Sequence, residues 1–178
     1  MQPGRQQRAT AARGRDRRLY PTVAIVCYTN AGKSTLLNSL VGSQVALADD
    51  KLFVTLDPTS RQVKLGDGQT AIVTDTVGFI HKLPHQLVDA FRATLEEVTR
   101  ADVLIEVVDA SDAHFAEHRA TVQTVLDELG AGTKLRLVAF NKADLLVAGG
   151  GVAAQAPIVA GRVLVSALTG FGLDALRD

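Results

Sequence analysis

The chain has 178 residues, of which 47% are hydrophobic, and its 19 lysines and arginines equal its 19 aspartates and glutamates in number. This length gives room for one sizeable hydrophobic core and excludes a second full domain, and no apolar run reaches the about 20 residues that a membrane span needs. One cysteine excludes an internal disulfide, and the absence of tryptophan leaves little for base stacking. We expect a cytoplasmic protein with no membrane or DNA partner.

Positive charge is concentrated at the N-terminus. Residues 1–20 hold six arginines against one aspartate, a net charge of +5, which leaves −5 for the rest of the chain. Because no apolar stripe runs through this segment, we expect residues 1–20 to form a basic, disordered stub. The alternative is that its arginines contact nucleic-acid phosphates such as those of ribosomal RNA.

Strand-like and helix-like patterns alternate from residue 21 onward. The predicted strands and helices are, in chain order, strand 22–26, helix 33–40 ending at Gly42, hairpin strands 61–65 and 70–74, a helix with an apolar face over 87–98, strand 103–108, helix 115–129, strands 135–140 and 162–165, and a helix from Leu173 that the end of the chain truncates. This alternation predicts an α/β fold over residues 21–178, with a mostly parallel, doubly wound sheet and helices on both faces.

The segment between the first strand and the first helix has the pattern of a phosphate-binding loop. In such a loop Gly32 leaves room for the phosphate, Lys33 reaches the β and γ oxygens, and the Ser34 hydroxyl holds Mg²⁺ at the positive end of a helix. The nucleotide contacts we expect here come from Tyr28, Thr29, Asn30, Ala31, Gly32, Lys33, Ser34 and Thr35. The pattern predicts a nucleoside triphosphate ligand and a P-loop NTPase fold.

The loop departs from the usual pattern at its first position, where Cys27 stands in place of glycine. One interpretation is a small, buried residue at the end of the strand. The other is a redox-sensitive thiol beside the phosphates, which no second cysteine could resolve.

Two later motifs are spaced as a GTPase requires. In the Asp75 to Gly78 motif the carboxylate meets Mg²⁺ through water, and the glycine brings a backbone N–H to the γ-phosphate. After the strand at 135–140 come Asn141, Lys142 and Asp144, whose carboxylate can accept hydrogen bonds from both N1 and the 2-amino group of guanine. Adenine offers neither donor there, so the ligands predicted are GTP and GDP.

Further nucleotide contacts are expected from two less specific segments. Ser166, Ala167 and Leu168 follow the last predicted strand, where a loop would offer a backbone N–H to the guanine O6. Thr55 is our choice for the switch I threonine that meets Mg²⁺ and the γ-phosphate, and Thr59 is its competitor. We thus expect metal contacts from Ser34, Thr55 and Asp75.

Within the GTPases the chain resembles the HflX family, in the Obg–HflX branch of translation GTPases. The resemblance spans about residues 21–174 and is carried by YTNAGKSTL (28–36), LFVTLDPT (52–59), DTVGFI (75–80), LPH (83–85) and FRATLEE (91–97). It implies a P-loop NTPase G domain that hydrolyses GTP and acts on the ribosome, mainly its large subunit with its rRNA and proteins, in splitting or rescue under stress. Family members carry an N-terminal domain and a helical linker, of which only a stub is expected here.

The catalytic groups expected are Lys33, Thr55, Gly78 and Asn30. Many small GTPases place a glutamine after the Asp75 to Gly78 motif, whereas this chain has Phe79, which cannot orient water, so slow intrinsic turnover is expected. In resembling GTPases an asparagine at the Asn30 position can bind K⁺ beside the β–γ bridge; the alternative is an asparagine that stabilises the loop. Other functions left open are a nucleotide-binding module with little or no hydrolysis and a G protein of ribosome assembly or tRNA modification.

Overall fold

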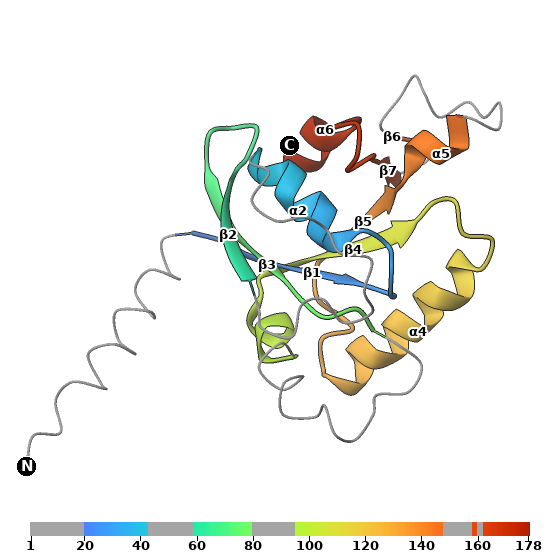
Figure 1. Cartoon of the computed structure of the whole chain (residues 1–178). Coiled ribbons are helices and arrows are strands. Elements are labelled where there is room, and N and C mark those ends of the chain that lie inside the picture. The colour runs from blue at the N-terminus through green and yellow to red at the C-terminus, as the bar shows by residue number, and fades with distance from the viewer. Residues whose placement is uncertain (1–19, 43–58, 80–94, 148–157, 160–161) are drawn as a thin grey trace, which may run out of the picture.

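The computed structural model describes residues 20–42, 59–79, 95–147, 158–159 and 162–178 (Figure 1). Its strands are β1 (Thr22–Cys27), β2 (Thr59–Lys64), β3 (Thr70–Asp75), β4 (Val103–Asp109), β5 (Arg136–Asn141), β6 (Ile158–Val159) and β7 (Arg162–Leu164). Its helices are α2 (Lys33–Val41), α4 (Phe115–Glu128), α5 (Ala143–Val147) and α6 (Leu173–Arg177), and residues 95–100 are also helical. No helix in these ranges is long and apolar enough to cross a membrane.

The described strands form one sheet in the order β2-β3-β1-β4-β5-β7-β6. The five central strands are parallel to their neighbours, and only the edge strands β2 and β6 run antiparallel. Because β1, β3, β4 and β5 are parallel, their carboxyl ends lie at the same edge of the sheet. The predicted mostly parallel α/β sheet is confirmed.

Helices cover both faces of this sheet (Figure 1). Successive residues of β1 point to opposite faces, so Ile25 packs in a cluster with α2 and α6, while Val26 packs in a second cluster with α4 and the helical segment 95–100. Both side chains are fully buried. Because both faces of a parallel sheet are covered, its strands have near-continuous apolar runs, which explains why the sequence shows them without alternation.

The boundaries differ from the predicted ones in a few places. The first hairpin strand begins at Thr59 instead of Arg61, and the strand β6 and the helix α5 were not predicted. Thr59, the competitor for the switch I role, is therefore the first residue of β2, where it pairs with Asp75 across the antiparallel ladder. Of the predicted helix over 87–98, residues 95–98 are described, and they lie in the helical segment 95–100.

Several sequence-based predictions lie outside the described residues. They are the disordered stub, of which only Tyr20 is described, the switch I candidate Thr55, and most of the predicted 87–98 helix. These stay predictions.

Candidate functional site

The phosphate-binding loop connects the buried end of β1 to the start of α2. Gly32 is the residue before the helix and has a φ of +89°, in the left-handed region that favours glycine. Its carbonyl accepts the helical hydrogen bond from the Leu36 N–H at 2.9 Å. Asn30 also has a positive φ, of +61°, which asparagine tolerates better than most side chains. The loop therefore turns sharply enough to present its N–H groups at the positive end of α2.

Close contacts favour glycine at two positions, Gly32 and Gly78. A Cβ on Gly32 would lie 2.5 Å from the Asn141 side-chain nitrogen, and a Cβ on Gly78 would lie 3.2 Å from the Thr29 Cα. The first contact is shorter than real Cβ atoms show, and the second is tight against backbone that cannot move freely. Both glycines of the predicted motifs thus sit where the phosphate loop meets another motif.

Lys33, Ser34 and Asp75 form a compact charged cluster at the carboxyl ends of β1 and β3. The Lys33 Nζ lies 3.3 Å from the Asp75 Oδ1, and the Ser34 hydroxyl donates to the Asp75 Oδ2 at 2.7 Å. The Lys33 side chain is 11% exposed and that of Asp75 is 4% exposed. Two groups predicted from separate motifs therefore meet in a poorly solvated place, where charge interactions are stronger than in water.

The donor set of this cluster fits Mg²⁺. That ion prefers hard oxygen ligands and uses one or two protein groups together with phosphate oxygens and water. The Ser34 hydroxyl and the Asp75 carboxylate, already within hydrogen-bonding distance of each other, provide such a pair. Across the described ranges no group of three or more His, Cys, Asp or Glu side chains could hold a metal ion instead.

The second half of the site lies at the ends of β5 and β7. The buried Asn141 side chain donates to the Ala31 carbonyl at 2.9 Å and accepts from the Ala167 N–H at 2.9 Å. The Ser166 hydroxyl donates to the Asp144 Oδ1 at 2.6 Å, which fixes the carboxylate predicted to read guanine. One amide thus ties the phosphate loop to the segment that carries Ser166 and Ala167.

Lys142 and Leu168 complete the predicted set on this side. Lys142 has a φ of +63°, and its Nζ lies 2.7 Å from the Asp109 Oδ2. Leu168 is 80% exposed, and Thr35 lies in the first turn of α2. Asp109 was not predicted as a site residue, although its position one residue after the predicted strand 103–108 was a signal for it.

Cys27 and Phe79 are both packing residues in this structure. Cys27 is 1% exposed, and burial raises the pKa of its thiol to about 11, so the interpretation as a buried residue at the strand end is favoured over the redox-sensitive thiol. Phe79 is also 1% exposed and packs near α4, and its backbone N–H donates to the Cys27 carbonyl at 2.8 Å. The residue after the Asp75 to Gly78 motif is therefore held away from solvent.

Fold and site together define the class of this protein. It is a P-loop domain of the GTPase type, in which Lys33, Ser34 and Asp75 meet at one end of the candidate site and Asn141, Asp144 and Ser166 at the other. The family model described as "50S ribosome-binding GTPase" matches residues 22–142. The chain belongs to this family, and within it to the HflX GTPases, as the sequence motifs predicted.

Similar proteins support both steps of this assignment. The GTPase HflX of Akkermansia muciniphila is 55% identical over 140 residues, which are 79% of this chain and 32% of that protein. A GTP-binding protein of Sulfolobus solfataricus, solved in complex with GDP, is 28% identical with a TM-score of 0.68, over 98% of this chain and 55% of that one. Era of Aquifex aeolicus, solved bound to GDP and AlF4⁻, is 26% identical with a TM-score of 0.67, over 87% and 54%. The chain spans about a third of the length of the curated relatives it matches.

Proposed function

We propose that this chain binds GTP with Mg²⁺, hydrolyses it to GDP and phosphate, and serves as a molecular switch of the HflX type. The observation that carries the proposal is the Asn141 side chain, which bonds the phosphate loop at Ala31 and the base loop at Ala167. It makes one continuous site out of motifs that are 110 residues apart in the sequence. The phosphates and the base of one nucleotide therefore bind to two loops that Asn141 already holds in a fixed relative position.

The phosphate end supplies the chemistry of this proposal. Lys33 binds the β and γ oxygens, and the loop N–H groups from Tyr28 to Ser34 surround the β-phosphate. Ser34 and Asp75 hold Mg²⁺, which when bound neutralises charge that develops on the phosphate oxygens. Gly78 offers its N–H to the γ-phosphate, and its close approach to Thr29 supports that geometry. These groups stabilise the transition state as the bond to GDP lengthens.

The base end supplies the selectivity. Asp144 accepts from N1 and the 2-amino group of guanine, and the Ser166 hydroxyl at 2.6 Å holds the carboxylate in place for it. The Ala167 N–H donates to Asn141, so Leu168 is left to offer its backbone N–H near the guanine O6, and the Lys142 stem lies along the ring. A site built around such hydrogen bonds rejects a base that lacks the donors, because its polar groups are then left unpaired.

The selectivity test compares the parent chain with Asp144→Asn. The parent should bind a fluorescent GDP that GTP displaces and ATP does not. In Asp144→Asn the amide donates where the carboxylate accepted, so we expect GTP to bind about 5- to 150-fold more weakly, or 1–3 kcal/mol, and xanthine nucleotides to gain affinity. Equal displacement of the probe by ATP and GTP from the parent would remove the guanine assignment.

A bound monovalent cation could assist hydrolysis without help from a partner protein, because the chain has a side chain that can bind it. Phe79 is buried and cannot orient the attacking water. Asn30 is exposed in the loop and can place its side-chain oxygen on K⁺ beside the β–γ bridge, where a cation supplies the charge of an arginine finger. Phosphate release should therefore be slow in Na⁺ and faster in K⁺. GTP binding without phosphate release in either salt would favour the non-hydrolysing module instead.

The partner we propose is the large ribosomal subunit, in the cytoplasm. Support comes from the family description, which names 50S ribosome binding, and from the HflX relatives. Only the γ-phosphate can hold the switch segments of Thr55 and Gly78 in one ordered state, so binding should depend on the nucleotide.

Ribosome binding can be measured by sedimentation with isolated large subunits. We expect weak binding that a non-hydrolysable GTP analogue favours over GDP. The net charge of +5 in residues 1–20 should make it steeply salt-dependent, because each neutralised phosphate releases counterions. Sedimentation with precursor subunits in preference to mature ones would point to ribosome assembly instead.

A further inference from the structure

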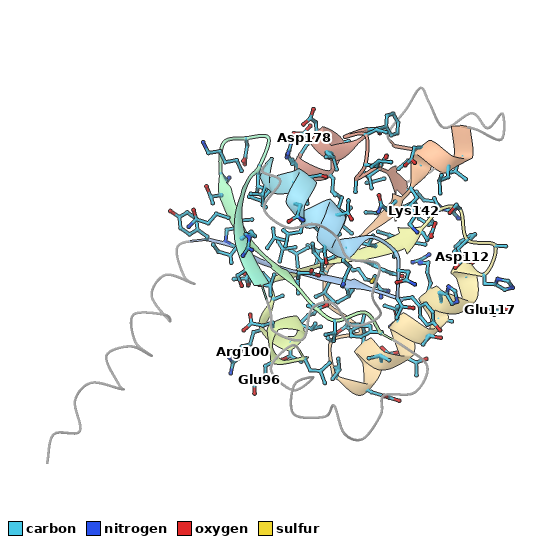
Figure 2. The ribbon with its side chains drawn as sticks, viewed as in Figure 1. Glu96, Arg100, Asp112, Glu117, Lys142 and Asp178 are labelled. Atoms are coloured by element: carbon cyan, nitrogen blue, oxygen red, sulfur yellow. The ribbon has the colours of Figure 1, made fainter. Side chains whose placement is uncertain are left out.

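The carboxyl end of β4 carries Asp109, which belongs to none of the GTPase motifs but forms an ion pair with Lys142 of the base motif. Asp109 is the last residue of β4 and lies opposite Asn141 in the parallel ladder with β5. Its Oδ2 accepts from the Lys142 Nζ at 2.7 Å, and Figure 2 shows Lys142 beside the tip of β4. The side chains of Asp109 and Lys142 are 21% and 34% exposed, so the pair is half-buried at the edge of the base end.

The Asp109 carboxylate is held from its other side. Its Oδ1 accepts from the Ser111 N–H at 2.9 Å and from the Ser111 hydroxyl at 2.6 Å, which leaves Oδ2 directed at Lys142. Burial raises the pKa of Asp109, but the hydrogen bonds from Lys142 and Ser111 outweigh it, and the pKa lies below its ordinary value. Asp109 therefore presents a fixed negative charge to the lysine at neutral pH.

Lys142 is fixed at its backbone end as well. Its φ of +63° is one that L side chains rarely adopt, and hydrogen bonds on both sides hold it there. The Ala110 N–H donates to the Asn141 carbonyl at 2.8 Å, and the Ala143 N–H donates to the Val165 carbonyl at 3.0 Å. With its Cα and its Nζ both anchored, the four-carbon stem between them has little freedom.

A fixed stem matters for binding a planar base. Lysine has more rotamer freedom than most side chains, and a flexible lysine would lose that freedom when the base packs against it. A partly exposed ion pair adds little to the stability of a fold, because solvent screens it and ordering the side chains opposes it. The larger consequence of this pair is therefore pre-organisation of the base end.

We propose that Asp109, itself oriented by Ser111, is a positioning residue that holds the Lys142 stem along the guanine plane and so raises affinity for guanine nucleotides. The inference rests on the proposed guanine-nucleotide site. Asp109 acts through Lys142 and touches neither the phosphates nor the reacting bond.

The test uses Asp109→Asn, which keeps the shape and the acceptor for Ser111 but removes the charge. We expect the Kd for GDP and the KM for GTP to rise about ten-fold with kcat unchanged, because the phosphate end is untouched. The melting temperature without nucleotide should stay close to that of the parent. Asp102→Asn is the matched control: this carboxylate lies just before the start of β4, bonded to Thr22, and its loss should leave affinity unchanged.

A double-mutant cycle separates positioning from a structural role. Lys142→Met keeps the stem and removes the ammonium, so adding Asp109→Asn to it should cause no further loss of GDP affinity. A ten-fold loss in both backgrounds, or GDP affinity in Asp109→Asn equal to that of the parent, would overturn the proposal.

If Asp109→Asn does not fold, Ser111→Ala tests the same proposal. It keeps the charge of Asp109 and should weaken GDP binding about three-fold; unchanged affinity there would overturn the proposal too. If the parent itself binds no guanine nucleotide, the function proposed above fails instead.

Discussion

Lys33→Ala is expected to weaken GTP binding by about 30- to 4,000-fold, or 2–5 kcal/mol, and to remove measurable hydrolysis. The Lys33 side chain is only 11% exposed and its Nζ lies 3.3 Å from the Asp75 carboxylate, so the ammonium is fixed in a poorly solvated place, where we expect the β and γ oxygens to bind. Truncation removes the positive charge where the transition state gains negative charge. Equilibrium binding of fluorescent GTP and GDP and single-turnover phosphate release give the two quantities.

The effect should be specific to this ammonium. Lys64→Ala makes the same chemical change at an exposed position in β2 and should leave both affinity and turnover unchanged. Without nucleotide, Lys33→Ala should also lower the free energy of unfolding, because the buried Asp75 carboxylate loses a nearby cation. A variant that binds and hydrolyses GTP as the parent does would show that the phosphates lie elsewhere.

The location of the site could be predicted from the sequence because the sheet is parallel. Each motif follows an apolar run, and the runs become β1, β3, β5 and β7, whose carboxyl ends face the same way. Once strand direction is known, Lys33, Asp75 and Asn141 must converge at one edge. Local pattern and global fold agree here, which is why the predicted motifs meet in the structure.

The missed elements are those in which local pattern carries too little information. The helix α5 has five residues and begins two residues after the buried Asn141. Five residues are too few to show the apolar periodicity by which a helix is recognised in a sequence. The strand β6 has two residues and is defined only by antiparallel pairing with β7. Both elements are too short to give a periodic signal in the sequence. Their formation depends on neighbouring residues that the tertiary fold brings together.

The contact between Asp109 and Lys142 was missed for a different reason. Asp109 and Lys142 are 33 residues apart and meet only because β4 and β5 pair in register. The sequence shows an aspartate after an apolar run, which is also the pattern of an ordinary turn. Their contact follows from the order of strands in the sheet, which no local sequence motif predicts.

Asn141→Ala is expected to lower the free energy of unfolding by about 2–5 kcal/mol, although it removes only a small amide. The side chain is 2% exposed, donates to the Ala31 carbonyl and accepts from the Ala167 N–H, both at 2.9 Å. Truncation leaves two backbone groups without their partner in a place that is poorly solvated, and it leaves a cavity beside Gly32. For a chain of this size the melting temperature should fall by about 4–20 °C. Gln62→Ala, which truncates an exposed amide in β2, should change stability by less than about 0.5 kcal/mol.

Asn141→Ala should also weaken GDP binding, separately from its effect on stability, because the same amide joins the loop before α2 to the segment that carries Ala167. In the parent, GDP at 100 times its Kd should stabilise the fold by about 2.7 kcal/mol. The variant at the same GDP concentration should show little of that increment, since neither loop is held in the geometry that binds the nucleotide. Chemical unfolding of both proteins with and without GDP measures the increment directly. A variant that is destabilised but keeps the full increment would show that Asn141 supports the fold alone, and that the two halves of the site bind the nucleotide independently.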